Sequence, residues 1–306
     1  MKTSLLLQGI LLEEKDALVS NLALWSNLKI WRVAGKKFKG MFSDQDEINV
    51  MLEEGKGEFQ YWGLPRLRGT LLYVLAQHLD LEMTKIKTHA ELIDLGNEIE
   101  EGAINLLHQT SKGEFKGDSI EALIKFNLEQ MFKDLSKTFD KKSAGEQEDL
   151  VNNMLKVIAE MPDDQKNKLR DELGVDDLTE STIRTAIITG TLGVAFAAVV
   201  EVAGFSAYIF AVKALAAIAG LVGLTLPFAA YSTLTSMMAA LANPYLILPM
   251  VLGLGFFMTN KANKKIRNAL VPTIVAQSAV NAAKGEINDQ SIKQTIKSFN
   301  KVKYDS

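Results

Sequence analysis

Two opposite charges lie within a part of the sequence that is otherwise uncharged. Glu201 and Lys213 are the only acidic or basic residues within residues 185–260. Ionisable side chains in apolar spans usually face a bundle interior or a watery path, so this pair is a candidate functional site. On one straight helix the two would lie about 18 Å apart along the axis, and they can pair only if the chain folds back near residues 204–208. Alternatively, both lie at the level of the lipid head groups, with the lysine reaching outward.

The side chains that most enzyme chemistry needs are missing or badly spaced. The chain has no cysteine, which excludes disulfides, thiolate metal sites and cysteine nucleophiles. His78, His89 and His108 do not have the spacing of a zinc-binding pair, and no phosphate-binding loop or nucleophile elbow occurs. We therefore expect no enzyme activity, no cofactor and no metal, with the histidines on the surface or at helix ends. The basic tail also lacks interleaved aromatic residues, so nucleic acid is not an expected partner.

The apolar part that holds the charge pair is long enough for several membrane spans. A helix needs about 20 residues to cross the hydrocarbon core, and the expected spans are residues 186–209, 211–230 and 245–259. The alternative is that these helices form the buried centre of a soluble bundle. The remaining helices are short and strongly charged, with narrow apolar stripes to cover such a centre. This comparison favours a Gly/Ala-rich hydrophobic helical hairpin region in a bilayer.

Charge divides the chain into three parts. The net charge of −3 combines an acidic first part, a neutral middle and a tail in which nine Lys or Arg residues face three acids. We expect an acidic helical head over residues 1–180, hydrophobic membrane-inserting helices over 181–260 and a basic amphipathic tail over 261–306. The residues that would hold the last span on the anionic, cytoplasmic side are Lys261, Lys264, Lys265 and Arg267.

The tail has the pattern of a basic amphipathic helix. Ile292, Ile296 and Phe299 recur at helical spacing, opposite Lys293 and Lys297. Such a helix suits a membrane surface or an acidic partner. Alternatively, it docks on the acidic head of its own chain.

Helix signals dominate the head, and no segment shows strand alternation bounded by hairpin turns. A leucine stripe predicts a helix over residues 65–81, and Thr88 with Glu91 predicts a capping box at the start of the next helix. Asp118 with Glu121 repeats that pattern before a long apolar stripe that ends at residue 139. Residues 141–147 are expected to form a hinge. Helix boundaries are further expected at Pro162, Gly174 and Thr179. The predicted class is all-α, with a helical bundle head and a basic amphipathic C-terminal helix.

Three runs carry a resemblance to a known family. They are MPDDQKNKLRDELGVDDLTESTIRTAI from residue 161, GFSAYIFAVKALAAIAG from residue 204 and NPYLILPMVLGL from residue 243. Together they resemble the YaaW-like family of bacterial proteins, sometimes labelled ubiquinol–cytochrome c chaperone-like. The resemblance covers residues 161–258, implies an apolar helical region, and supplies no catalytic residues.

The pattern as a whole predicts a membrane-active helical protein. Its apolar helices would insert into an anionic lipid bilayer and permeabilise it by forming homo-oligomers, as a pore-forming toxin or defence effector does. The acidic head would regulate insertion or bind a protein partner. The N-terminal run is broken by Gln8 and closed by Glu13 and Glu14, so it is not expected to be a secretion signal. The expected location is the inner membrane, or the cytoplasm with membrane association. The alternative function is a non-enzymatic assembly factor with a buried apolar core.

Overall fold

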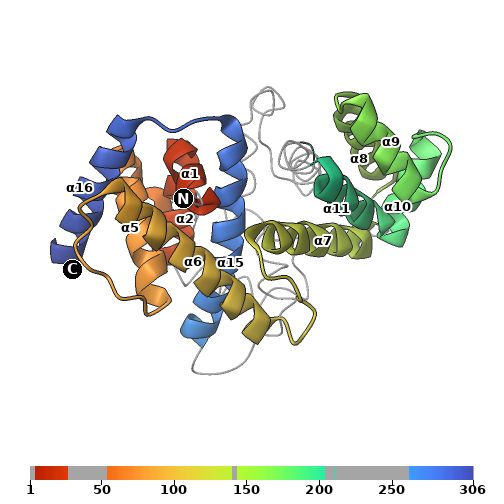
Figure 1. The fold of residues 1–306 in the computed structure, drawn as a ribbon. Helices are drawn as coiled ribbons and strands as arrows, with labels where there is room; N and C mark the ends of the chain where they lie inside the picture. The colour runs from red at the N-terminus through yellow and green to blue at the C-terminus, as the bar shows by residue number, and fades with distance from the viewer. Residues whose placement is uncertain (1–3, 27–53, 140–142, 204–209, 211–261, 306) are drawn as a thin grey trace. The chain divides into compact units, whose positions relative to one another are not determined.

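The computed structural model describes residues 4–26, 54–139, 143–203, 210 and 262–305. Every regular element within these ranges is a helix, which confirms the all-α prediction (Figure 1). The chain forms two compact units: unit 1 contains residues 1–123 and 242–306, and unit 2 contains residues 124–241. This division differs from the predicted boundaries near residues 180 and 260, because the tail belongs to the same unit as the N-terminal helices.

The helices of unit 1 come from both ends of the chain, and those of unit 2 follow one another in sequence. Unit 1 contains α1 (Leu5–Leu12), α2 (Lys15–Ser26), η2 (Phe59–Tyr61), α5 (Leu64–His78), α6 (His89–Thr110), α15 (Ala262–Val280), η4 (Asn281–Lys284) and α16 (Asp289–Asp305). The helix α7 (Ile120–Phe139) begins in unit 1 and continues in unit 2. Unit 2 also contains α8 (Ala144–Ala159), α9 (Asp163–Leu173), α10 (Glu180–Thr189) and α11 (Thr191–Ala203).

The helix α1 carries apolar side chains on nearly every side, and it is accordingly buried on nearly every side. Leu6, Leu7 and Ile10 are almost completely shielded from solvent, and α1 packs against α6, α15 and η4. Its approach to α15 is very close, since a Cβ added at Gly9 would lie 1.8 Å from the backbone oxygen of Ser278. Only glycine leaves room for that contact.

A carboxylate from α6 holds the first turn of α1. Ser4 caps α1, and its Oγ accepts a hydrogen bond from the Leu7 amide at 3.0 Å. Glu100 Oε1 accepts hydrogen bonds from Ser4 Oγ and from the Leu6 amide, both at 2.7 Å. A negative charge at this position is favoured by the partial positive charge of the helix N-terminus. The start of the chain is thereby fixed to α6.

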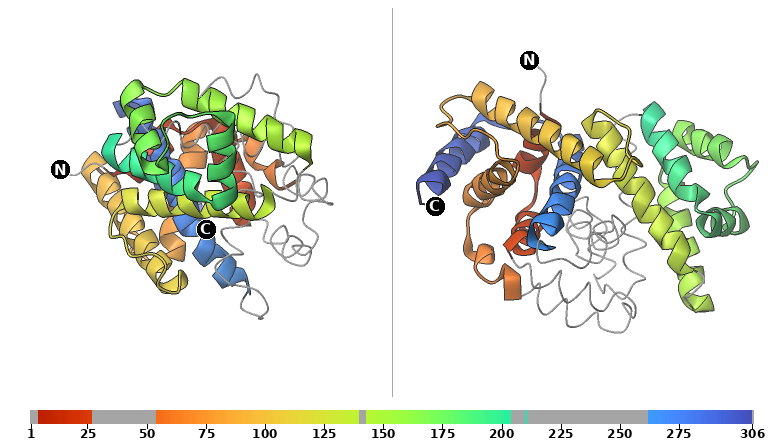
Figure 2. Two further views of the ribbon diagram at one scale, coloured as in Figure 1. Left: turned by 90° about the vertical axis from the view of Figure 1, so that its right-hand side faces the viewer. Right: turned by 90° about the horizontal axis from the view of Figure 1, so that it is seen from below.

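The predicted helix over residues 65–81 is α5, and its leucine stripe faces the core of unit 1. Leu67, Leu71 and Leu75 are fully buried. One neighbour of this helix is α16, which lies alongside α5 (Figures 1 and 2). The two backbones meet at Gly69, where an added Cβ would lie 2.7 Å from the amide nitrogen of Phe299. Phe299 is fully buried there, and its ring packs edge-on against Tyr73 with centroids 6.1 Å apart.

The helix α15 contributes core side chains that the sequence did not lead us to expect. Leu270, Val271 and Ile274 have no solvent exposure, and α15 packs against α1 and α6. The predicted basic tail over residues 261–306 therefore begins with a core helix of unit 1.

Most helix boundaries in the head follow their predicted capping signals. Thr88 caps α6, although the Glu91 carboxylate accepts from the Lys87 amide rather than from Thr88 itself. The start of α7 is capped by Ser119, whose Oγ accepts from the Ala122 amide, so the prediction of Asp118 as the cap was wrong. The predicted stop at Gly174 is confirmed, with a left-handed φ of 64°. Local backbone chemistry was thus sufficient for these boundaries.

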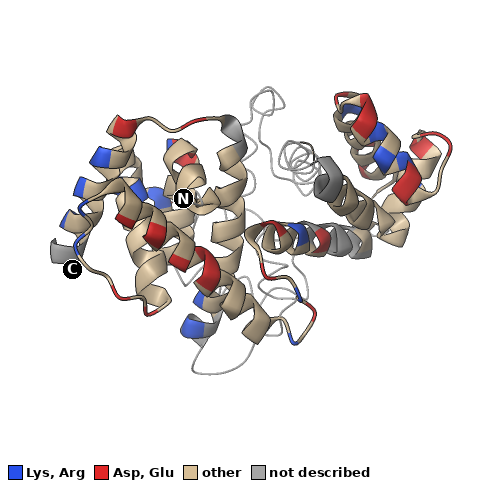
Figure 3. Ribbon diagram, in the orientation of Figure 1, with Lys and Arg blue, Asp and Glu red and all other residues tan. Residues whose placement is uncertain are grey.

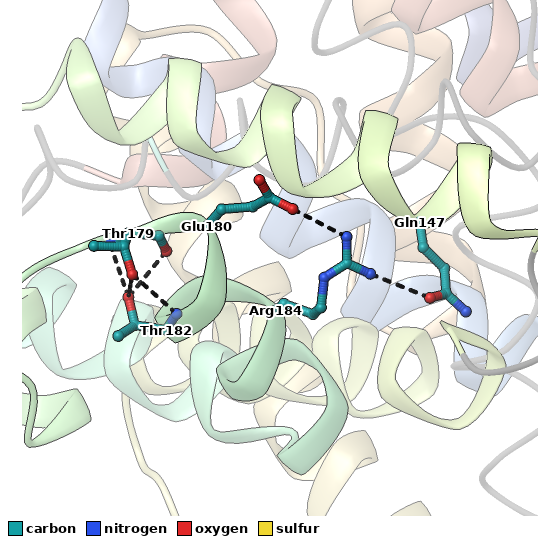
Figure 4. A network of polar contacts seen from close by, with 5 residues as sticks. All are labelled: Gln147, Thr179, Glu180, Thr182 and Arg184. Carbon is teal, nitrogen blue, oxygen red and sulfur yellow. Dashed lines mark hydrogen bonds and ion pairs between the residues drawn. The ribbon is translucent and has the colours of Figure 1, made fainter.

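Polar contacts fix the start of α8 in unit 2. Ser143 and Glu146 form a capping box, and Gln147 Nε2 donates to the Phe139 carbonyl at 3.1 Å. Gln147 Oε1 also accepts from Arg184 on α10, and Arg184 in turn contacts Glu180, with both distances 3.2 Å (Figure 4). Residues 143–147 therefore join three helices, where the sequence had suggested a hinge.

The first part of the apolar block is bent. The helix α10 begins at a capping box formed by Thr179 and Thr182 (Figure 4). It ends at Gly190, which has a left-handed φ of 74°. The axes of α10 and α11 differ by 103° across this glycine. The predicted continuous span over residues 186–209 is thus interrupted, because Gly190 readily adopts the conformation that ends a helix.

No single helix among the described residues has both the length and the apolar composition needed to cross a membrane. The bent pair formed by α10 and α11 meets these criteria only when its two parts are taken together.

Candidate functional site

The structure describes only part of the predicted charge pair. Glu201 lies in the last turn of α11, and its side chain is not among the described ones. Lys213 lies outside the described residues, as do the predicted spans over 211–230 and 245–259 in full. The pairing of Glu201 with Lys213 therefore remains a prediction.

The predicted membrane-flanking cluster falls on the first turns of α15. Lys261 lies outside the described residues, and the side chain of Lys265 is not described. Lys264 is exposed, whereas Arg267 is half-buried with its Cζ 5.2 Å from the centre of the Trp25 ring. These residues begin a helix that enters the core of unit 1, so they occupy an edge of that unit.

Next to this cluster, unit 1 contains a polar pocket with a volume of about 450 Å³. It is formed by the end of α5, the residues that follow it, one side of α6 and the start of α15. Its lining residues are His78, Leu79, Asp80, Leu81, Glu98, Glu101, Gly102, Asn105, Leu106, Gln109, Lys264 and Asn268. The pocket therefore joins parts of the chain that are far apart in sequence.

His78 is the most enclosed titratable group of this pocket. Its Nε2 lies 2.8 Å from Asn268 Oδ1, and because an amide oxygen only accepts, the ring nitrogen donates. The Trp25 ring packs edge-on against the imidazole, with centroids 5.3 Å apart. His78 is the last residue of α5, in line with the expectation that the histidines lie on the surface or at helix ends, and its side chain is half-buried.

Charges on several elements act on His78. Burial lowers the pKa of His78 from its ordinary value, and the hydrogen bond to Asn268 raises it. Arg267 and Lys264 lower the pKa further, and Asp80 raises it. The imidazole is consequently a poor proton acceptor in the folded protein, because burial and two cations oppose its positive form.

The composition of the pocket suits the binding of a polar or cationic group. Asp80, Glu98 and Glu101 supply carboxylates, and the amides of neighbouring residues supply donors and acceptors. The lining residues include no Ser, Thr or Cys that could act as a nucleophile. Among the described residues, no group of three or more His, Cys, Asp or Glu side chains is arranged to hold a metal ion.

A second polar cluster lies inside unit 1, away from the pocket lining. Glu13 is 2% exposed, and its carboxylate accepts hydrogen bonds from Asn21 Nδ2 at 3.0 Å and Ser278 Oγ at 2.9 Å. Arg68 is also buried and donates from Nε to the Ile10 carbonyl at 3.2 Å. Burial lowers the pKa of Arg68 and the nearby charge of Glu13 raises it. This cluster connects α1, α2, α5 and α15.

The predicted amphipathic face of the tail is present, and its apolar side is occupied by the chain itself. Ile292 and Phe299 are buried and Ile296 is half-buried, while Lys293 and Lys297 are exposed. The helix α16 that carries them packs on α5 and contacts α6. The sequence left two alternatives for this helix, binding to a membrane surface or acidic partner and docking on its own chain. The structure shows it docked on its own chain.

Sequence patterns alone did not predict the polar pocket. His78 lies 190 residues before its partner Asn268, and Trp25 comes from a third helix. The one local signal was the basic cluster that begins α15, which we had assigned to a membrane boundary. Neither a family model, nor a curated protein, nor a solved structure matches the chain, and the resemblance to the YaaW-like family stays a prediction.

Proposed function

We propose that this protein is a membrane-active helical protein that inserts its apolar helices into an anionic bilayer. The observation that carries the proposal is the stretch of residues 185–260, in which Glu201 and Lys213 are the only charges. Burying so long an uncharged stretch is favourable in lipid hydrocarbon. The proposed location is the inner membrane, or the cytoplasm with membrane association.

Apolar side chains exposed at the start of this stretch support the proposal. Ile188 on α10 is 46% exposed, and Val194 on α11 is 59% exposed. Both flank the bend at Gly190, and the bent pair has the length and composition of a broken span or a re-entrant loop. A role as a pore-forming toxin or defence effector, acting as a homo-oligomer, is the finer form of this proposal.

Leakage of dye from anionic liposomes tests the proposal. We expect the purified protein to release dye, and we expect the double variant Glu201→Ala, Lys213→Ala to associate with the liposomes but release less. The reason is that paired charges in a span line the polar path rather than drive insertion. The matched control is Glu14→Ala, Lys15→Ala, which removes one acid and one base from exposed positions of unit 1. Absence of leakage with wild-type protein at every pH would exclude permeabilisation.

A second function is favoured by the packing of α11. Leu192, Phe196 and Val199 on this helix are each 1% exposed, and α11 packs against α9 within unit 2. This part of the apolar stretch is therefore covered by protein, as in a non-enzymatic assembly factor with a buried apolar core. An alkaline carbonate wash of cell membranes separates the two functions: retention supports insertion, and release of a monodisperse protein without affinity for vesicles supports the assembly factor.

A further inference from the structure

The exposed side of α16 forms part of a larger basic surface. Lys293, Lys297 and Lys301 recur every fourth residue along this helix and are all exposed. Side chains at this spacing lie on one face of a helix. Figure 3 shows these basic positions along α16, whereas α6 carries mainly acidic ones.

A distant segment adds two more lysines to this face. Asn300 on α16 holds the backbone of Ile86 at both ends: its Oδ1 accepts from the Ile86 amide at 3.0 Å, and its Nδ2 donates to the Ile86 carbonyl at 2.7 Å. Ile86 is buried, and Lys85 and Lys87 on either side of it are exposed. This segment is not helical, and the exposure of both lysines beside the buried Ile86 shows that they face solvent while Ile86 faces the core.

The lysine face is therefore defined as Lys85, Lys87, Lys293, Lys297 and Lys301. Within the described parts of the chain, none of the five makes an ion pair, so their charges are available to a partner. Glu91 lies at the edge of the face, where its carboxylate accepts a hydrogen bond from the Lys87 amide at 2.6 Å.

We propose that the lysine face binds the anionic surface of a lipid bilayer through its charges, while the apolar side of α16 stays docked on α5. This inference rests on the proposed function, and it specifies how unit 1 meets the membrane. Lysines are flexible, strongly hydrated point charges, which suit a diffuse anionic surface better than a defined bidentate site. The face includes no described exposed aromatic residue on which nucleic acid bases could stack.

The mode of binding differs from insertion of an amphipathic helix. An inserting α16 would have to expose Phe299 and Ile292, which are buried against unit 1, and would leave Lys85 and Lys87 behind. A docked α16 uses all five lysines together. Lys85 and Lys87 therefore distinguish the two modes.

The test is co-sedimentation of full-length protein with vesicles of phosphatidylcholine mixed with phosphatidylglycerol, and with phosphatidylcholine alone. Each lysine near an anionic surface strengthens binding by about fivefold, so Lys85→Gln, Lys87→Gln should weaken it roughly 25-fold. The matched control is Lys112→Asn, Lys116→Gln at the opposite end of α6, which removes the same charge from exposed positions. Asparagine is chosen at position 112 because φ there is 54°, a conformation that asparagine tolerates.

We expect the control variant to bind like wild type and added salt to weaken wild-type binding. A second variant, Lys293→Gln, Lys297→Gln, tests the same face from α16 and should lose affinity to a similar extent. The inference is overturned if wild type does not prefer anionic vesicles or if Lys85→Gln, Lys87→Gln binds like wild type. It is also overturned if the control variant Lys112→Asn, Lys116→Gln loses as much affinity as Lys85→Gln, Lys87→Gln.

Dye release measured in the same vesicles separates this inference from the proposed function. Wild-type protein that binds through the lysine face but releases no dye would leave the inference standing and exclude permeabilisation. Dye release by Lys85→Gln, Lys87→Gln with unchanged vesicle binding would overturn the inference and leave permeabilisation standing.

Discussion

At the scale of single residues, the interior of unit 1 is held by a carboxylate that joins four helices. Glu13 ends α1, accepts hydrogen bonds from Asn21 and Ser278, and lies near the buried guanidinium of Arg68. A buried charged group of this kind is costly to leave without its partners. The cluster therefore favours one arrangement of α1, α2, α5 and α15 over others in which the same apolar surfaces meet.

Replacing Glu13 by alanine should destabilise the protein strongly. The substitution removes the negative charge near the buried Arg68 and leaves the donors of Asn21 and Ser278 buried without their acceptor. We expect a cost of about 3–5 kcal/mol in the free energy of unfolding. The adjacent Glu14 is exposed, and Glu14→Ala should change that free energy by less than about 0.5 kcal/mol. Urea denaturation of the two variants measures the difference. Equal effects would show that the buried contacts of Glu13 contribute nothing.

His78 should make stability depend on pH. Its pKa is lowered in the folded protein, so below the ordinary value of 6.5 the unfolded chain binds more protons than the folded one. The free energy of unfolding should therefore fall as the pH decreases from 7 towards 5, and His78→Gln should reduce this dependence. The matched control is His89→Gln, which removes an imidazole from an exposed position at the start of α6. If the free energy of unfolding depended on pH equally in wild type and His78→Gln, His78 would not be the source of this dependence.

At the scale of elements, the contact between α5 and α16 depends on backbone proximity. Gly69 on α5 faces the amide of Phe299 so closely that any side chain would separate the two helices. The hydrogen bonds between Asn300 and Ile86 hold the end of α16 to the segment before α6. The docked position of α16 is thus fixed at two points, and the lysine face depends on both.

Gly69→Ala should loosen α16. We expect a loss of about 1–3 kcal/mol in the free energy of unfolding, because the new methyl group clashes with backbone rather than with a movable side chain. Hydrogen exchange of the α16 amides should become faster. Gly145 near the start of α8 has nothing within 4 Å of an added Cβ, so Gly145→Ala should leave α16 protected and stabilise α8 by up to about 1 kcal/mol. Unchanged exchange in Gly69→Ala would show that α16 is not held by this contact.

The elements that the sequence predicted well are those whose signals are local. The leucine stripe of α5 and the caps at Thr88, Gly174 and Thr179 each depend on residues within one or two helical turns. The same local reasoning missed the capping box at Ser143, because glycine and charged residues around it suggested a hinge.

The elements that the sequence did not predict depend on distant partners. The apolar side of α15 follows a cluster of lysines and arginines, and only its packing on α1 identifies it as core. The polar pocket likewise needs His78 and Asn268 to meet across 190 positions of the chain. A single sequence carries no record of which distant surfaces meet, so composition alone assigned α15 to a membrane boundary.

At the scale of the whole molecule, unit 1 is closed by the last helices of the chain. The core side chains of α1 and α5 are covered by α15 and α16, which lie far along the sequence from them. The predicted head over residues 1–180 therefore contains only part of the core of unit 1.

A fragment of residues 1–180 should not form unit 1. Without α15 and α16, the apolar surfaces of α1 and α5 lose their neighbours, and the remaining helices bury too little apolar area to offset their conformational entropy. Hydrogen exchange of the α5 amides should be fast in this fragment and slow in the full chain. Adding a peptide of residues 262–306 should restore protection. A fragment that unfolds with the same cooperativity and midpoint as the full chain would contradict this expectation.

The pairing of early and late helices also sets the order of events during synthesis. The ribosome must add some 140 residues after position 123 before α15 begins, which takes roughly 7 to 28 seconds at ordinary elongation rates. During that interval the apolar side of α1 that packs against α15 has no partner and is exposed on the nascent chain. The core of unit 1 can therefore be completed only after α15 and α16 have been synthesised.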